Sequence, residues 1–180
     1  MLLQLINYPY FWNLISVITG VILGFLLGEG GRYIHYCLRI HKLKKIIKDE
    51  LRAIIAQIPQ KKDIVNQIIA ALEKRQTLSG LSVRIINTGY NQHIAELYEH
   101  LPILKRNCLH VIHESLNIAD KTLYSFERDF ISIGKIIDYP FMTYKGRFLD
   151  ILHTYDKVEK LIKEYLEGKP SDVFYIKNKK

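Results

Sequence analysis

The first charged side chain in this sequence of 180 residues belongs to Glu29. The 19 residues from Pro9 to Leu27 are almost entirely apolar, and Asn13 is the only strongly polar residue among them. A helix rises about 1.5 Å per residue, so about 20 apolar residues cross a hydrocarbon core of roughly 30 Å. The run therefore predicts a single transmembrane helix within residues 1–31, with the aromatic cluster at its start forming an interfacial belt.

A cleaved signal peptide is the alternative interpretation of this apolar run. Such a peptide needs a basic region before a shorter apolar core and a cleavage site of small residues. No lysine or arginine precedes Arg32, and the run ends in "LLGEGG". The pattern therefore favours an anchor that is retained.

The flanks of the run predict its orientation. Six basic residues lie between Gly31 and Asp49, namely Arg32, Arg39, Lys42, Lys44, Lys45 and Lys48. Because basic residues collect on the cytoplasmic side, we expect a single-pass inner-membrane protein with its N-terminus outside and its bulk in the cytoplasm. These charges either set the topology alone or also contact anionic lipid headgroups, and the sequence leaves both open.

Small residues recur at every fourth position of the apolar run: Ser16, Gly20, Gly24 and Gly28. Helices in lipid gain no hydrophobic energy by pairing, but small residues let two backbones approach closely. Glycine is also common in membrane helices in general. Three consecutive steps of four nevertheless favour an oligomerisation face, so we expect a homo-oligomer in the lipid bilayer.

The rest of the chain is predicted to be all-α, a cytosolic helical bundle following the transmembrane helix. A first apolar stripe at helical spacing comprises Ile40, Leu43, Ile47, Leu51, Ile54 and Ile58. This stripe can pack on the domain or pair with itself in an oligomer. Pro59 is expected to end the helix. The expected segments are an anchor at 1–31, a basic juxtamembrane helix at 32–58, a helical cytosolic domain at 59–168 and a tail at 169–180.

Further helices are expected on both sides of Pro102. One covers about residues 60–76, and one runs from Ser82, a possible N-cap, to His100. Pro102 begins another pattern that is read as one helix or two, and "DYPF" reads as a turn. The last helix covers residues 144–168 and stops at Gly168, while the tail is a short strand or a free peptide.

No motif of an enzyme is found. The sequence lacks a nucleophile elbow, a Gly-rich phosphate loop and GxGxxG. In "HVIHE", His110, His113 and Glu114 resemble metal ligands, but the HExxH spacing is absent, so structural or surface histidines are the better interpretation. Cys108 lies beside two basic residues but fits a buried small residue better than a reactive thiol. We therefore expect no catalytic residue, no metal and no cofactor.

The formal net charge of +8 suggests an acidic partner. Five basic residues fall near expected helix starts or turns and are the candidate phosphate ligands: Arg84, Lys105, Arg106, Lys145 and Arg147. Helix N-termini and guanidinium groups suit phosphates, and Tyr90, Tyr98 and Tyr144 are candidates for stacking on bases. The simpler alternative at each position is a basic residue on a basic surface. We expect a small phosphate-bearing ligand and no duplex nucleic acid.

Three parts of the chain together resemble a known architecture: the anchor "WNLISVITGVILGFLLGEGG", the basic junction "RIHKLKKIIK" and the domain after Pro59. The layout resembles small bacterial membrane effectors of phage defence, above all CRISPR-associated membrane effectors gated by cyclic oligoadenylate. The resemblance implies an oligomeric inner-membrane effector that senses a cyclic oligonucleotide and disrupts the membrane in antiviral defence. It transfers no site residue. The alternatives are a membrane-tethered scaffold that recruits a protein partner and a hydrolase whose site has no recognisable motif.

Overall fold

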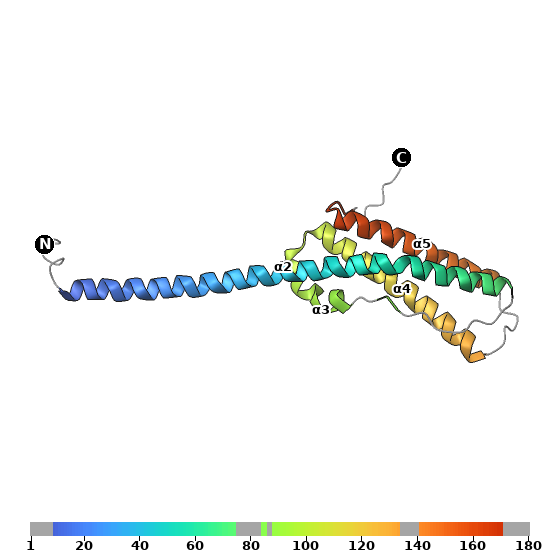
Figure 1. Cartoon of the computed structure of the whole chain (residues 1–180), viewed down its shortest axis with the longest axis horizontal. Helices are drawn as coiled ribbons and strands as arrows, with labels where there is room; N and C mark the ends of the chain where they lie inside the picture. The colour runs from blue at the N-terminus through green and yellow to red at the C-terminus, as the bar shows by residue number, and fades with distance from the viewer. Residues whose placement is uncertain (1–8, 75–83, 86–87, 134–140, 171–180) are drawn as a thin grey trace. The chain divides into compact units, whose positions relative to one another are not determined.

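The computed structural model describes residues 9–74, 84–85, 88–133 and 141–170 (Figure 1). The elements are α2 (Pro9–Glu73), α3 (Thr88–Leu97), the 3-10 helix η1 (Tyr98–His100), α4 (Ile103–Ile133) and α5 (Phe141–Leu166). No strand occurs among the described residues. The predicted all-α class is confirmed for this part of the chain.

The chain divides into two compact units, Met1–Leu43 and Lys44–Lys180. In the first unit, the side chains of residues 12–39 are all exposed, although most of them are apolar up to Leu27. Within the described part of the chain, α2 is the one helix that is long and apolar enough to cross a membrane. The first two charges after the apolar run neutralise each other, because Arg32 lies 2.7 Å from Glu29 one turn earlier.

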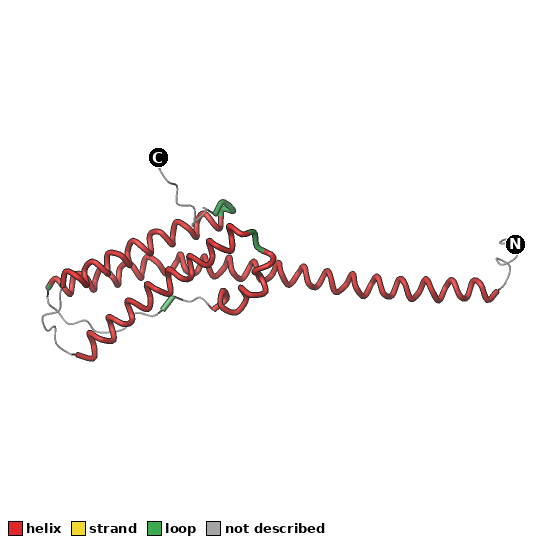
Figure 2. The backbone as a smooth tube through the Cα atoms, turned by 180° about the vertical axis from the view of Figure 1, so that it is seen from behind, coloured by secondary structure: helices red, strands yellow, loops and turns green. Residues whose placement is uncertain are grey.

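In the second unit, the later part of α2, α4 and α5 lie side by side as a three-helix bundle, seen from opposite sides in Figures 1 and 2. The end of α2 meets the start of α5, where Glu73 and Lys145 form an ion pair at 2.7 Å. The end of α4 also meets the start of α5, since the ring of Phe126 packs edge-on against Phe148 at 4.6 Å. Helix α5 is therefore antiparallel to both α2 and α4.

The core of the bundle is built on one face of α2. All six residues of the predicted stripe are buried, and those from Ile47 onward belong to the second unit. Beyond Pro59 the same spacing continues through buried Val65, Ile68 and Leu72. The stripe therefore packs within its own chain, which was one of the two expected arrangements.

The predicted helix end at Pro59 is wrong, because α2 continues through this residue to Glu73. A proline inside a helix costs about 3 kcal/mol, since it lacks an N–H and its ring presses on the preceding turn. Pro59 is exposed, so its ring displaces no core side chain. Each buried aliphatic side chain beyond it contributes about 1.5–3 kcal/mol, which outweighs that cost. The helix expected at 60–76 is thus the continuation of α2.

The helix expected from Ser82 begins later, at Thr88. Ser82 lies outside the described residues, and residues 84 and 85 are not helical. The backbone N–H of Ile85 donates instead to the Asp120 carboxylate at 2.7 Å, and the Ile85 side chain is buried. This contact with α4 holds residues 84–85 in an irregular conformation.

The two later helices follow the sequence pattern closely. Helix α4 begins directly after Pro102 and is a single helix. Helix α5 ends before Gly168, whose φ of 82° favours glycine. The N–H groups of Gly168 and Lys169 donate to the carbonyls of Tyr165 at 3.1 Å and Glu164 at 2.9 Å, a Schellman motif. The predicted stop is confirmed. The tail from 171 on lies outside the described residues, as does "DYPF" except Phe141, the first residue of α5.

Replacing Pro59 by alanine tests the continuity of α2. Pro59→Ala restores one helical hydrogen bond in an exposed position, so we expect the free energy of unfolding to rise by about 1–3 kcal/mol. Urea denaturation of the full chain in detergent, followed by circular dichroism, measures the change. Pro102→Ala, placed where no helical hydrogen bond is missing, is the control and should change stability little. A loss of stability in Pro59→Ala would contradict a continuous helix.

Candidate functional site

A buried carboxylate, Asp120 of α4, joins the three helices of the bundle. Its Oδ1 lies 3.4 Å from the Lys61 ammonium of α2 and accepts a hydrogen bond from the Tyr155 hydroxyl of α5 at 3.5 Å. Its Oδ2 accepts the N–H of Ile85. Burial, together with the charge of Asp120, raises the pKa of Tyr155, which stays a neutral donor. We call Lys61, Asp120, Tyr155 and Ile85 the Asp120 cluster. Both oxygens of its buried carboxylate have partners, which fits a role in positioning the three helices.

A second buried cluster fixes the start of α3. The Glu50 carboxylate of α2 accepts hydrogen bonds from the backbone N–H groups of Gly89 and, at 3.0 Å, Tyr90. These are the free N–H groups that every helix start presents. A Cβ at Gly89 would lie 2.6 Å from a Glu50 oxygen and 3.2 Å from Ile46, so glycine permits this close approach. The cap comes from a residue about forty positions away, so the local sequence could not reveal it.

His113 of α4 lies beside this cap and is only 4% exposed. Its ring stacks on Tyr90, with centroids 3.7 Å apart and an interplanar angle of 10°. Neither ring nitrogen has a hydrogen-bond partner, and Nε2 lies 3.8 Å from Glu50. Burial lowers the pKa of His113 to about 4, so the imidazole is neutral at pH 7. Burial also raises the pKa of Glu50, while the two backbone N–H groups oppose that shift.

The histidines and the cysteine singled out in "NCLHVIHE" fall into different environments. His113 lies in the core, whereas His110 and Glu114 are exposed. Among the residues that the structure describes, no group of three His, Cys, Asp or Glu side chains could hold a metal ion. Cys108 is fully buried, as expected, and burial together with nearby Glu164 raises the pKa of its thiol to about 11.

The predicted phosphate ligands do not meet at one place within the chain. Lys105 and Arg106 lie in the first turn of α4. Lys145 and Arg147 lie near the start of α5, at the opposite end of the bundle. Between Arg106 and Phe126, which packs on the start of α5, helix α4 advances about 30 Å. A single ligand-sized site therefore cannot contain all five.

Most of the predicted phosphate ligands already contact a tyrosine ring or a carboxylate of the same chain. Three guanidinium groups lie over tyrosine rings, at 4.8 Å for Arg84 on Tyr124, 4.6 Å for Arg106 on Tyr98 and 5.9 Å for Arg147 on Tyr144. Lys145 forms the ion pair with Glu73. Tyr90 is stacked on His113, so its ring faces the core rather than a base.

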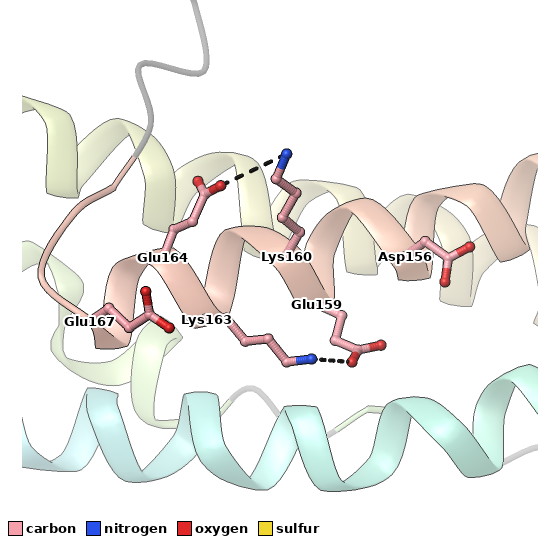
Figure 3. A pocket seen from close by; sticks show the side chains of 6 residues that line it. All are labelled: Asp156, Glu159, Lys160, Lys163, Glu164 and Glu167. Carbon is pink, nitrogen blue, oxygen red and sulfur yellow. Dashed lines mark hydrogen bonds and ion pairs between the residues drawn. The ribbon is translucent and has the colours of Figure 1, made fainter.

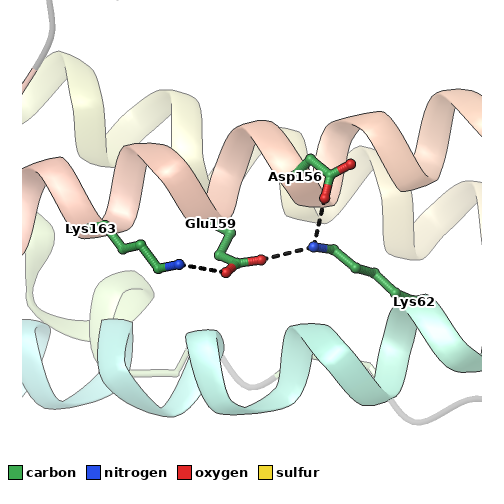
Figure 4. Close-up of polar contacts among 4 residues, drawn as sticks. All are labelled: Lys62, Asp156, Glu159 and Lys163. Atoms are coloured by element: carbon green, nitrogen blue, oxygen red, sulfur yellow. Dashed lines mark hydrogen bonds and ion pairs between the residues drawn. The ribbon is translucent and has the colours of Figure 1, made fainter.

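An acidic hollow lies along α5 (Figure 3). Its lining contains four carboxylates and two ammonium groups, from Asp156, Glu159, Lys160, Lys163, Glu164 and Glu167. Figure 4 shows that Lys62 of α2 bridges two of these carboxylates, at 2.7 Å from Asp156 and 2.8 Å from Glu159. Hydrogen bonds from Lys163 and Lys62 lower the pKa of Glu159 to about 2. The ion pairs of Lys62 hold α5 against α2.

A second hollow, of about 310 Å³, lies between α4 and α5 and has the opposite charge. Its lining residues are Lys121, Thr122, Ser125 and Phe126 of α4 and Tyr144, Arg147 and Phe148 of α5. We call it the basic groove. It contains Arg147 from the predicted set, but sequence reasoning missed Lys121. Only the antiparallel pairing of the helices brings these two cations into one groove.

The predicted oligomerisation face is open along the helix. Ser16, Gly20, Gly24 and Gly28 are exposed, and a Cβ added at any of these glycines would meet no atom within 4 Å. The Ser16 hydroxyl donates to the carbonyl of Asn13 at 2.8 Å. The face has room for a second helix, and association through it stays a prediction.

Comparison with known proteins gives no relative: the chain matches no family model, no curated protein and no solved structure.

Removing the Asp120 carboxylate should destabilise the bundle. Asp120→Ala leaves the buried Lys61 ammonium and the Ile85 N–H without their partner, so we expect a loss of about 3 kcal/mol in denaturation of the full chain. Adding Lys61→Met removes the unpaired charge and should restore part of this loss. A double variant as unstable as the sum of two independent losses would contradict the pairing.

His113 predicts an acid-dependent loss of stability. Its pKa falls from 6.5 to about 4 on folding, so only the unfolded chain binds this proton between these values. Stability contributed by the neutral imidazole is therefore complete above pH 6.5 and declines by about 3 kcal/mol as the pH falls to 4. Comparing denaturation at pH 7 and pH 4, His113→Leu should lose less stability than the original chain. The exposed His110→Gln should behave like the original, and equal slopes in all three chains would refute the assignment.

Proposed function

We propose that this protein is an oligomeric single-pass membrane protein whose helical bundle senses an anionic ligand and alters the bilayer in response. The observation that carries this proposal is the continuity of α2. One helix contains both the apolar run and the buried stripe on which the bundle is built. A change in bundle packing therefore acts on the same helix that enters the lipid.

The membrane assignment rests on the exposed apolar surface of residues 12–27 and on the aromatic residues that bracket it. The apolar run from Pro9 to Leu27 gives a spacing of about 28 Å along the helix, with exposed Trp12 near its start and exposed Tyr33 beyond its end. This spacing matches a hydrocarbon core of roughly 30 Å, and aromatic residues favour its two boundaries. The basic residues from Arg32 to Lys48 support a bundle in the cytoplasm and an N-terminus outside. The inner membrane of a bacterium is the membrane that the architectural resemblance implies.

Signalling requires that the ligand bind two arrangements of the bundle with different affinity. Moving an equilibrium from 1:99 to 99:1 takes about 5.5 kcal/mol of differential binding. Charge-assisted hydrogen bonds contribute about 1.5–3 kcal/mol each, so two to four contacts made in one arrangement only are enough. The surface arginines and lysines of the bundle supply such contacts for phosphate groups.

The ligand class follows from charge and from the architectural resemblance. The net charge of +8 and the arginine–tyrosine pairs on the bundle suit a phosphate-bearing ligand with aromatic bases. A cyclic oligonucleotide, such as cyclic oligoadenylate, has both, and the biological context would be antiviral defence. Self-association through the face that contains Gly20 and Gly24 would bring several membrane helices together.

A membrane-tethered scaffold is the second candidate function. The observation that favours it is the apolar surface at the start of α4, where Tyr98, Ile103 and Leu104 are 51%, 63% and 42% exposed. Exposed apolar side chains in one region are typical of surfaces that bind proteins.

Reconstituting the full chain distinguishes the two candidates. The protein is placed in vesicles containing anionic phospholipid and a trapped dye, and cyclic di-, tri- and tetranucleotides are added from outside in the cytoplasmic-side-out orientation. The sensor proposal expects one of these ligands to bind by calorimetry and to release dye. No binding across the panel would overturn the sensor and favour the scaffold. Turnover of nucleotide or lipid would instead point to an enzyme.

The small-residue face gives a matched test of association. Gly24→Leu fills the space through which a second backbone would approach, so the oligomer in detergent should become smaller and dye release should decrease. Ile22→Leu lies on the opposite side of the helix and should leave both unchanged. Sedimentation in detergent measures the size. An unchanged oligomer in Gly24→Leu would rule out this face as the interface.

A further inference from the structure

We infer that the basic groove between α4 and α5 binds a phosphate group of the ligand through Lys121 and Arg147. This inference rests on the proposed function and gives the sensed anion a location. Each helix provides one cation to the lining of the groove, and Ser125 of α4 also lines it.

The basic groove has a positive charge. The described residues that line it include two cations and no carboxylate, whereas the acidic hollow on the same helix α5 contains four carboxylates. Lys121 and Arg147 are exposed, and neither forms an ion pair with another described residue. Lys62 and Lys145, by contrast, are neutralised by carboxylates. The groove therefore has two positive charges that no carboxylate of the described residues neutralises.

The hydrogen-bond donors of the basic groove lie on two helices, α4 and α5. Ser125 lies one turn after Lys121 on α4, so its hydroxyl and the ammonium share a face. The Arg147 guanidinium lies 5.9 Å from the Tyr144 ring, which limits its freedom. Beneath them, the buried rings of Phe126 and Phe148 pack edge-on. A fork of N–H groups, an ammonium and a hydroxyl are the donors that phosphate oxygens accept.

The size of the groove limits what enters it. About 310 Å³ is at the small end of the range for ligand pockets, which runs from about 300 to 1,000 Å³. One phosphate with its attached sugar or base fits into this volume, whereas a whole cyclic oligonucleotide is too large for it. The rest of such a ligand would lie outside the groove, where a second subunit could contribute its own groove.

The groove is also connected to α2 at two points. Lys121 directly follows Asp120, whose carboxylate contacts Lys61 of α2. Arg147 lies two residues after Lys145, which pairs with Glu73 near the end of α2. An anion that draws the two cations together therefore acts on segments that hold α2 in the bundle.

The experiment uses the full chain in nanodiscs and titrates it with inorganic pyrophosphate and with cyclic tri- and tetra-adenylate. Lys121→Gln and Arg147→Gln should each weaken binding about tenfold, and the double variant about a hundredfold, because each loses one charge-assisted contact. Lys157→Gln, an exposed lysine of α5 outside the groove, is the matched control and should bind as the original chain does. The affinity of the double variant should also depend less on salt.

The outcomes separate the groove from the wider proposal. If the original chain binds a probe and the double variant binds it equally well, the groove assignment is overturned while the proposed sensing function stands. If the original chain binds none of the probes, both the groove and the sensing function are overturned. Circular dichroism and thermal melting of the variants confirm that the exposed substitutions leave the fold intact, so weaker binding in a folded double variant supports the groove.

Discussion

Burial of one continuous stripe on α2 is the constraint on which the described bundle depends. The stripe extends from Ile40 to Leu72 and keeps its helical spacing across Pro59. The gain from burying apolar side chains on both sides of the proline exceeds the cost of the missing hydrogen bond. Helices α4 and α5 then complete the core around it. In the Asp120 cluster, Asp120 of α4 contacts both Lys61 of α2 and Tyr155 of α5, which fixes how the helices align along α2.

The local sequence pattern predicted those parts of the fold that depend on interactions between residues close in sequence. The spacing of apolar residues identified the stripe, and Gly168 ended α5 because a positive φ favours glycine. The helix end predicted at Pro59 was wrong because tertiary packing outweighed the about 3 kcal/mol by which proline disfavours a helix interior. The start of α3 was missed for a related reason, since Glu50, which caps it, is distant in sequence.

The candidate site was harder to predict than the fold. Single basic residues such as Arg147 were identifiable from the sequence, but their grouping required the antiparallel order of α4 and α5. In that order, Lys105 and Arg106 lie at the end of the bundle opposite Arg147. Lys121, which belongs to no motif, lines the same groove as Arg147. Composition thus predicted an anionic partner, while the arrangement of the helices determines which basic residues line the same groove.

The Glu50 cap has a consequence for the dynamics of the chain. Helix α3 has only 10 residues, fewer than an isolated helix needs in water. Its helicity therefore depends on the carboxylate at its start and on the stacking of Tyr90 against His113. Losing these contacts would melt α3 as one cooperative unit while the three long helices stay folded. Amide hydrogens of α3 would then exchange with solvent together, in openings too small to disturb the core.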